Sequence, residues 1–334
     1  MILVTGGTGL VGTHLLLELI NEGETVRALY RDKKSIEKVK QVFKWNNLSP
    51  NLVDEKIEWV KSDILNPEDF KNCFEGIIQV YHCAAMVSFN KKDKEKLFQT
   101  NINGTANLVN LCIHYKIEKL CYVSSTAAVG KAPKNGIRTE DCQWKDDGVS
   151  NYSVSKYLSE MEVWRGIEEG LNAVIVNPSI IIGPGDWNNS SSNLFLKAWK
   201  GLKFYSSGAN AFVDVRDVTS SMISLMKSDI SAERFLIIAE NISFRDLFNQ
   251  IATALKKPLP NIKAQKWMVN TLWKVEAIKS FLFGSTPLIT KESAESAMSI
   301  TRYSNKKIKD TLKKDFISIE ESIKYTATIF LNDK

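Results

Sequence analysis

The chain has 334 residues, 44% of them hydrophobic and 25% charged, which is the composition of a globular protein, and the length favours one large domain with a smaller lobe. The net charge of +6 is mild, and the densest basic stretch, Lys91 to Lys96, is interrupted by Asp93 and Glu95, so no nucleic-acid partner is expected. The five cysteines form no Cys-x-x-Cys pair and there are only three histidines, which argues against a disulfide framework or a metal site and favours a reducing cytoplasm.

The first twelve residues predict a strand that turns into a helix around a phosphate group. An apolar run ends in Gly6, Gly9 and Gly12. In such a turn the first glycine permits the tight bend, the second lets the backbone approach a pyrophosphate, and the third lets the helix pack on its strand. The residues expected to line the phosphates are Gly6, Thr8, Gly9, Leu10, Val11 and Gly12.

The second predicted strand, residues 24–30, ends where dinucleotide-binding proteins place the adenosine ribose. An Asp or Glu at this point binds the ribose hydroxyls, whereas an Arg accommodates a 2′-phosphate. This chain has Arg31 there, with Lys33 and Lys34 close behind, so NADP(H) is expected in preference to NAD(H). The adjacent Asp32 is the alternative partner of the ribose, so NAD(H) stays possible.

Two further strands, residues 57–61 and 77–83, are predicted to bring more of the cofactor site to the carboxyl edge of the sheet. A lysine-rich helix and a polar loop precede them, and a long helix through residue 115 follows. The lone His82 is interpreted as structural rather than catalytic. The residues expected to face the cofactor here are Asp63, Ile64, Cys83, Ala84 and Ala85.

A hydroxyl-rich segment, residues 124–128, follows a fifth strand at residues 119–124. Open α/β sheets place their ligands at this edge, so these hydroxyls can hold a substrate oxygen. A sixth strand, residues 172–177, is broken by Pro178, after which the chain is expected to leave the sheet.

A helix predicted between Ser150 and Gly170 carries Tyr152 and Lys156 four residues apart, on one face. The pattern Tyr-x-x-x-Lys is weak by itself. Its position 26 residues after Thr126, on the helix that follows the hydroxyl-bearing strand, allows the strand end and the helix face to converge. The apolar residues expected on the buried side of this helix are Leu158, Met161 and Trp164.

The second lobe is expected to be discontinuous in sequence, because strand-like patterns return at residues 211–215 and 235–238. The nucleotide-binding domain is therefore assigned residues 1–177 and 211–239, and the substrate-binding lobe residues 178–210 and 240–334.

Two helices are predicted within this lobe. Ser243 to Asp246 is a capping box that opens a helix. Lys266 to Phe283 is amphipathic and is expected to belong to the core or to a pocket lid, with contact to a membrane surface as the alternative. No apolar run approaches the roughly 18 residues of a membrane span, and the first strand begins at Met1, so neither a span nor a signal peptide is expected.

Taken together, the order and spacing of these motifs resemble the extended short-chain dehydrogenase/reductase family, also called the NAD-dependent epimerase/dehydratase family, over most of the chain. The resemblance implies an α/β fold of the Rossmann type, with a doubly wound parallel sheet of about seven strands. Val26 to Asp32 and Asn177-Pro178 are most similar to dihydroflavonol-reductase-like and 3β-hydroxysteroid-dehydrogenase-like members. The other segments that carry the resemblance are Thr5 to Gly12, Asp63, His82 to Ala85, Asn101 to Thr105, Ser124 to Thr126, Tyr152 with Lys156, and Asn177 to Asp186.

The resemblance also implies roles for individual side chains. Tyr152 corresponds to the proton donor, and Lys156 to the residue that stabilises its phenolate and binds the nicotinamide ribose. Thr126 corresponds to the hydroxyl that holds the substrate oxygen, and Asn101 to a residue of a proton path. Further cofactor contacts are expected from Ser124, Asn177, Ser179 and Ile180.

The expected function is that of an NADP(H)-dependent oxidoreductase that reduces the carbonyl, or oxidises the alcohol, of an apolar small molecule. A nucleotide-sugar epimerase or dehydratase with bound NAD is one alternative, although such enzymes usually carry Arg in place of Asn177. A non-catalytic nucleotide sensor is another, and a homodimer is possible. The candidates for an apolar pocket wall are Met86, Val87, Phe89, Trp187, Phe195, Trp199, Phe204 and Phe212.

Overall fold

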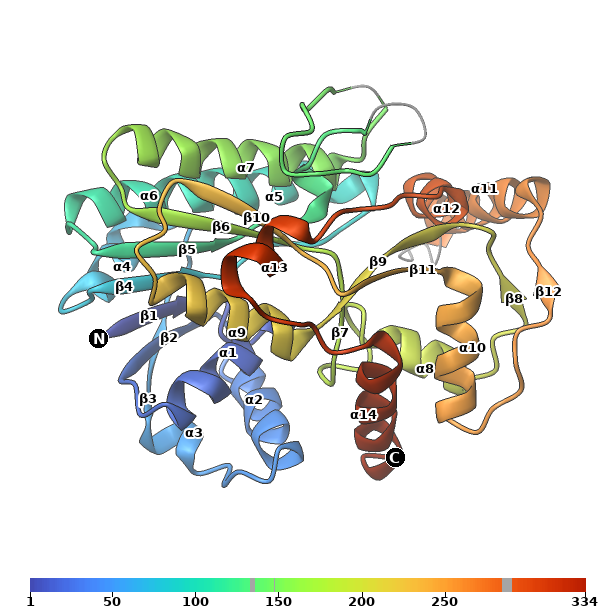
Figure 1. Cartoon of the computed structure of the whole chain (residues 1–334), viewed down its shortest axis with the longest axis horizontal. Helices are drawn as coiled ribbons and strands as arrows, with labels where there is room; N and C mark the ends of the chain where they lie inside the picture. Colours follow the sequence, from blue (N-terminus) through green and yellow to red (C-terminus); the bar gives the residue numbers. More distant parts are fainter. Residues whose placement is uncertain (133–135, 147, 284–289) are drawn as a thin grey trace.

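A seven-stranded parallel sheet organises the larger domain of the computed structural model, which describes residues 1–132, 136–146, 148–283 and 290–334 (Figure 1). The strand order is β10-β6-β5-β4-β1-β2-β3. The chain adds strands to one side of β1 as far as β3 and then to the other side from β4 onward, so the order of the strands reverses between β1 and β4. Ligands of open α/β sheets bind at such a reversal, and the predicted doubly wound sheet is confirmed. Its strands are β1 (Ile2–Thr5), β2 (Val26–Tyr30), β3 (Ile57–Lys61), β4 (Gln79–His82), β5 (Lys119–Val123), β6 (Ala173–Pro178) and β10 (Glu233–Ile237).

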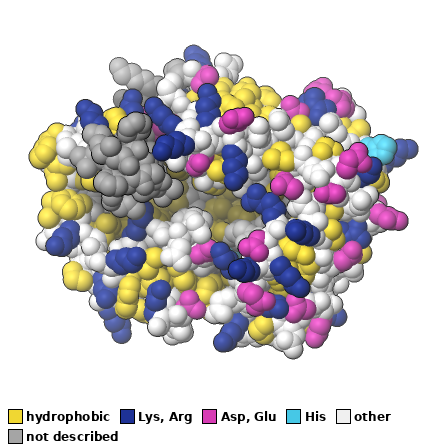
Figure 2. All heavy atoms as spheres, turned by 180° about the vertical axis from the view of Figure 1, so that it is seen from behind, with side chains coloured by type: hydrophobic (Ala, Val, Ile, Leu, Met, Phe, Trp, Pro, Cys, Tyr) yellow, Lys and Arg dark blue, Asp and Glu magenta, His cyan; other side chains and the backbone are white. Residues whose placement is uncertain are grey.

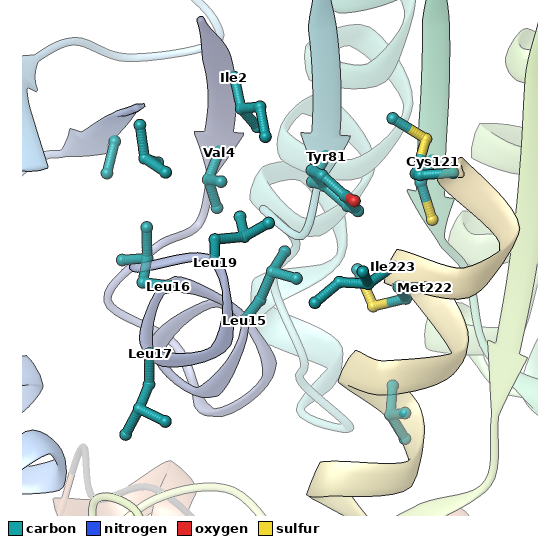
Figure 3. Close-up of a cluster of buried hydrophobic side chains, with 14 of the residues drawn as sticks. Ile2, Val4, Leu15, Leu16, Leu17, Leu19, Tyr81, Cys121, Met222 and Ile223 are labelled. Carbon is teal, nitrogen blue, oxygen red and sulfur yellow. The ribbon is translucent and has the colours of Figure 1, made fainter. Parts of the chain in front are cut away.

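Helices cover both faces of the sheet because each strand alternates its buried side chains between two apolar layers. Figure 3 shows Leu15, Leu16 and Leu19 of the first helix packed beneath Ile2 and Val4 of β1. The helices on this face are α1 (Leu10–Asn21), α2 (Lys34–Trp45), α3 (Leu52–Glu55) and α9 (Val215–Met226). Those on the other face are α4 (Pro67–Lys71), α6 (Gly104–His114) and α7 (Asn151–Glu168).

The second lobe is built around a three-stranded sheet, β11-β9-β7, with its own apolar core. Ser243 accepts a hydrogen bond from the Asp246 backbone N–H at 3.0 Å, so the predicted capping box does open a helix. The elements here are β7 (Ile180–Ile182), α8 (Asn193–Trp199), β8 (Phe204–Tyr205), β9 (Ala209–Asp214), β11 (Glu240–Ser243), α10 (Phe244–Ala254), β12 (Ile262–Lys263), α11 (Lys266–Phe283), α12 (Lys291–Met298) and α14 (Ile319–Asn332).

One segment assigned to the substrate lobe returns to the larger domain. Ile308 of α13 (Lys306–Leu312) is fully buried in the same core as α1 and α9. Lys307 Nζ donates to the Arg234 carbonyl at 2.9 Å, which ties α13 to the edge strand β10. The chain therefore makes one further excursion into the larger domain, with two additional crossings, before α14 returns to the second lobe.

Two apolar side chains of the helix α11 are exposed. Trp267 is 70% exposed and Leu272 is exposed as well, so neither of these two side chains belongs to the core. Within the described ranges, no helix combines the length and the apolar character that crossing a membrane requires.

The buried face of α7 is polar, contrary to prediction. Leu158 is 37% exposed, and Met161 and Trp164 are only partly buried. Hydrophobicity mispredicts this helix because its inner face packs against the polar carboxyl ends of strands rather than against a purely apolar layer. The residues that point inward are Ser155, Lys156, Ser159, Glu160, Val163 and Gly166.

The observed orientation of α7 predicts unequal effects of two truncations. Val163→Ala removes methyl groups from a fully buried side chain and should lower the free energy of unfolding by about 1.5 to 3 kcal/mol. Leu158→Ala should change it by less than about 0.5 kcal/mol, because that side chain is exposed. Urea unfolding followed by circular dichroism measures both, and a larger loss for Leu158→Ala would contradict the orientation.

Candidate active site

The first two turns of α7 and the carboxyl end of β5 bring the predicted catalytic residues together. Ser150 begins the helix, since its side chain accepts a hydrogen bond from the Ser153 backbone N–H at 3.0 Å. Lys156, which is 1% exposed, donates from Nζ to the Tyr122 hydroxyl at 2.8 Å and to the Val123 carbonyl at 2.9 Å. The sheet edge therefore supplies the acceptors for this buried ammonium.

Tyr152 lies beside Ser125. Burial raises the pKa of the Tyr152 phenol, and its hydrogen bond with the Ser125 hydroxyl opposes that shift. The Thr126 hydroxyl instead bonds with Tyr303. Ser125 therefore joins the predicted Thr126 as a candidate for the hydroxyl beside the phenol, because successive residues after a strand point in different directions. Phe89 packs edge-on against the Tyr152 ring, with centroids 5.6 Å apart.

Asn101 lies in a widened helical turn, the π-helix Gln99–Asn103 between α5 (Lys94–Phe98) and α6. Its amide accepts from the Met86 backbone N–H at 2.7 Å and donates to the Met86 carbonyl at 3.0 Å and to the Ser155 hydroxyl at 2.9 Å. It therefore fastens the segment after β4 to α7, next to Lys156. Such turns recur at functional sites.

His82 is held as a neutral, internal group. Its ring nitrogens bond with the hydroxyls of Thr5 at 2.6 Å and Thr105 at 3.1 Å. Burial, followed by the charge of Lys156, lowers its pKa to about 3. These contacts agree with the structural role expected for this histidine.

The glycine turn before α1 leaves room only for hydrogen atoms. A Cβ on Gly12 would lie 2.1 Å from the Gly6 carbonyl oxygen, and one on Gly6, at φ +67°, would lie 2.6 Å from the Ala84 nitrogen. Gly9 caps α1 without a side-chain bond, so the first N–H groups of the helix stay available to an anion. This backbone cradle fits the pyrophosphate of a dinucleotide.

Unpartnered polar atoms lie further along the same edge. Among the residues that the structure describes, the buried Asn177 Oδ1 and Ser179 Oγ, both at the end of β6, have no hydrogen-bond partner. Buried polar atoms are normally paired, so these positions fit a ligand that supplies hydrogen-bonding groups. Together with the glycine turn, the residues present fit a dinucleotide extended along the edge from β1 to β6.

The remaining cofactor candidates lie along this edge, with different environments. Ser124 is engaged elsewhere, since its hydroxyl donates to Glu160 at 2.6 Å. Ile64 is buried against Gly104 of α6. Arg31 is exposed directly after β2, whereas the Asp32 carboxylate accepts from the Lys34 backbone N–H at 3.0 Å. The others follow strand ends, namely Thr8, Leu10 and Val11 after β1, Asp63 after β3, Cys83, Ala84 and Ala85 after β4, and Ile180 after β6.

Several candidates for the apolar pocket wall belong to the core of the second lobe instead. Phe195 and Phe212 are fully buried there, and Trp187 packs with them while its indole donates to Asp333 at 2.8 Å. By contrast, Phe89 is exposed beside Tyr152, so it remains available to a substrate, and Val87 is exposed as well. Figure 2 shows one face of the molecule hollowed near its middle, with Lys and Arg interspersed among Asp and Glu around it.

Sequence reasoning missed four side chains of this site. The Tyr122 hydroxyl accepts a hydrogen bond from Lys156, the Ser125 hydroxyl lies beside the Tyr152 phenol, and Arg234 forms an ion pair with the buried Glu160. The spacing of four residues between Lys156 and Glu160 was the available signal, because it repeats the spacing of Tyr152 and Lys156 on the same helical face. Across the described residues, no cluster of three or more His, Cys, Asp or Glu side chains is arranged to hold a metal ion.

Known proteins resemble this chain both in sequence and in fold. The sequence profile of the NAD dependent epimerase/dehydratase family matches residues 2–237. A putative dihydroflavonol 4-reductase of Synechocystis sp. is 29% identical over 300 residues, covering 87% of this chain and 83% of the relative. A sterol demethylase protein B of Methylococcus capsulatus is 27% identical over 262 residues, covering 78% and 76%. The fold is like that of Thermus thermophilus UDP-glucose 4-epimerase in complex with NAD, with a TM-score of 0.75 at 20% identity over 100% of this chain and 99% of that chain.

Proposed function

The chain belongs to the NAD dependent epimerase/dehydratase family, and on that premise we propose that it reduces the carbonyl group of an apolar small molecule with NADPH, or oxidises the corresponding alcohol. Its membership makes it an enzyme, an NAD(P)-dependent oxidoreductase. The observation that carries the finer proposal is the Tyr152 phenol held against the Ser125 hydroxyl, one helical turn from the buried Lys156.

The proposed chemistry is a balanced addition across the carbonyl bond. When bound, the reduced nicotinamide would supply the hydride for the carbonyl carbon. Tyr152 gives its proton to the oxygen as negative charge develops there, and the Ser125 hydroxyl donates a hydrogen bond to the same oxygen. Lys156 stabilises the phenolate that remains, because a cation nearby favours the charged form of a phenol. The hydride and the proton account for the two hydrogen atoms that convert the carbonyl group into the alcohol.

The proposed substrate is a ring ketone or aldehyde rather than a nucleotide sugar. The two relatives described above carry names that refer to a flavonoid and to sterols, both apolar ring compounds. At the end of β6 the chain has the neutral Asn177, whose amide donates to the Ser125 carbonyl at 3.0 Å and to Glu160 at 2.8 Å, in place of the Arg usual in nucleotide-sugar epimerases. The exposed Phe89 adds apolar surface beside Tyr152.

A substrate panel tests this proposal. Aromatic and alicyclic ketones and aldehydes should oxidise NADPH, followed by the loss of absorbance of the reduced nicotinamide, whereas UDP- and dTDP-sugars should be neither isomerised nor bound. Tyr152→Phe should lower turnover by at least about 100-fold without weakening cofactor binding, because general-acid catalysis typically contributes that much. Saturable binding of a nucleotide sugar in calorimetry would favour the epimerase instead.

Two substitutions test which hydroxyl, that of Ser125 or that of Thr126, donates a hydrogen bond to the substrate oxygen. Ser125→Ala should lower kcat/KM by about 100-fold, because it removes a hydrogen bond to the developing oxyanion. Thr126→Val should lower it by less than about tenfold, since the hydroxyl it removes bonds with Tyr303. The dissociation constant of the cofactor serves as the control and should stay unchanged in both. The reverse ranking would restore Thr126 to the role that the sequence motif suggests.

We further propose that Arg31 selects NADPH, because it is exposed after β2 while the neighbouring Asp32 carboxylate is engaged by the start of α2. An ionic hydrogen bond to the 2′-phosphate at an exposed site should contribute about 1.5 kcal/mol, or roughly tenfold in Kd. Fluorescence titration should therefore show tighter binding of NADPH than of NADH. Arg31→Ala should remove most of that preference, whereas Arg302→Ala, at an exposed arginine elsewhere, should keep it. Equal wild-type affinities would refute the proposal.

A further inference from the structure

A buried carboxylate lies one helical turn beyond Lys156. Glu160 is fully buried, and its two oxygens are surrounded by donors. The Ser124 hydroxyl and the Asn177 amide donate to Oε2 at 2.6 and 2.8 Å, and Arg234 donates to Oε1 at 3.0 Å. Because every one of these partners is a donor, the arrangement suits the ionised carboxylate.

The anchoring elements are the carboxyl ends of β5 and β6 and the edge strand β10. An unpaired buried charge costs several kcal/mol, so a carboxylate persists in such a place only with hydrogen bonds and a counter-ion. The pairing cation is Arg234, whose side chain is 18% exposed against 0% for Glu160. Arg234 also donates to the Glu140 carbonyl, which holds the guanidinium in position.

The other titratable groups that face Lys156 carry no charge near neutrality. Burial raises the pKa of Cys83 to about 12, lowers that of His82 to about 3, and raises the pKa values of the Tyr122 and Tyr152 phenols. Burial also lowers the pKa of Lys156 to about 7, and the negative charge of Glu160 opposes that shift. Of these groups Glu160 is therefore the one that supplies negative charge.

We propose that Glu160 is a positioning residue of the active site, whose carboxylate, anchored by Ser124, Asn177 and Arg234, keeps Lys156 as an ammonium beside Tyr152. The role of Lys156 in catalysis rests on the proposed function. The effect of the Glu160 carboxylate on the protonation of Lys156 does not depend on any substrate. Removing the carboxylate disfavours the ammonium, so Lys156 loses its proton at lower pH.

The test is a titration of Lys156 in cofactor-free protein that carries ¹³C-labelled lysine, with Lys156→Met used to assign the signal. The wild-type midpoint is expected near pH 7. Glu160→Gln should lower the midpoint by at least about one pH unit, a tenfold change in proton affinity. Glu162→Gln, which changes a partly exposed carboxylate on the same helix, should leave it unchanged.

The Glu162→Gln control separates the charge effect of Glu160 from a general effect of substitution on this helix. An unshifted midpoint in Glu160→Gln would overturn the proposal, and so would a downward shift of equal size in Glu162→Gln. If Glu160→Gln does not fold, Glu160→Asp replaces it, since it keeps the charge but withdraws it by one methylene. It should then give a smaller downward shift, and no shift would again overturn the inference. Because no substrate is present, a failure of the ketone panel leaves this result interpretable.

Discussion

The burial of one ammonium group governs the architecture of the site. Lys156 is almost fully enclosed, and a charge in that position requires hydrogen-bond acceptors. The end of β5 supplies the Tyr122 hydroxyl and the Val123 carbonyl, and the next turn of α7 carries the buried carboxylate of Glu160, whose charge favours the ammonium. The inner face of α7 is polar for this reason, and the helix still packs because Val163 and Gly166 continue the contact with the apolar layer.

A second constraint is steric and fixes the opposite end of the cofactor edge. Gly6 and Gly12 allow α1 to begin against its own strand, and Gly6 lets the turn approach Ala84 after β4. The strands β1 and β4 meet at the reversal of the sheet order, so the glycine turn and the start of α7 lie along the same edge. Backbone geometry thus provides the common frame, and side chains from β5, β6 and α7 provide the chemistry.

The two lobes are joined by contacts that span the chain. The carboxylate of Asp333, next to the C-terminal residue, accepts hydrogen bonds from the indole of Trp45 in α2 at 3.3 Å and from that of Trp187 at 2.8 Å. Together with α13 on β10, these bonds hold the substrate lobe against the nucleotide-binding domain. A fold of this kind serves epimerases and reductases alike, so the choice between them depends on particular side chains, among them Asn177.

The sequence alone determined the features that depend on neighbours along the chain. The strand periods of β1 to β6, the glycine turn, the capping of α10 by Ser243 and the shared face of Tyr152 and Lys156 all follow from local spacing. Tertiary structure decided which hydroxyl meets Tyr152, that Phe195 and Phe212 fill a core, and that Leu158 faces outward. The pairing of Glu160 with Arg234 joins residues 74 positions apart. Such contacts depend on how strands and helices are arranged in space, and local propensity and periodicity do not encode that arrangement.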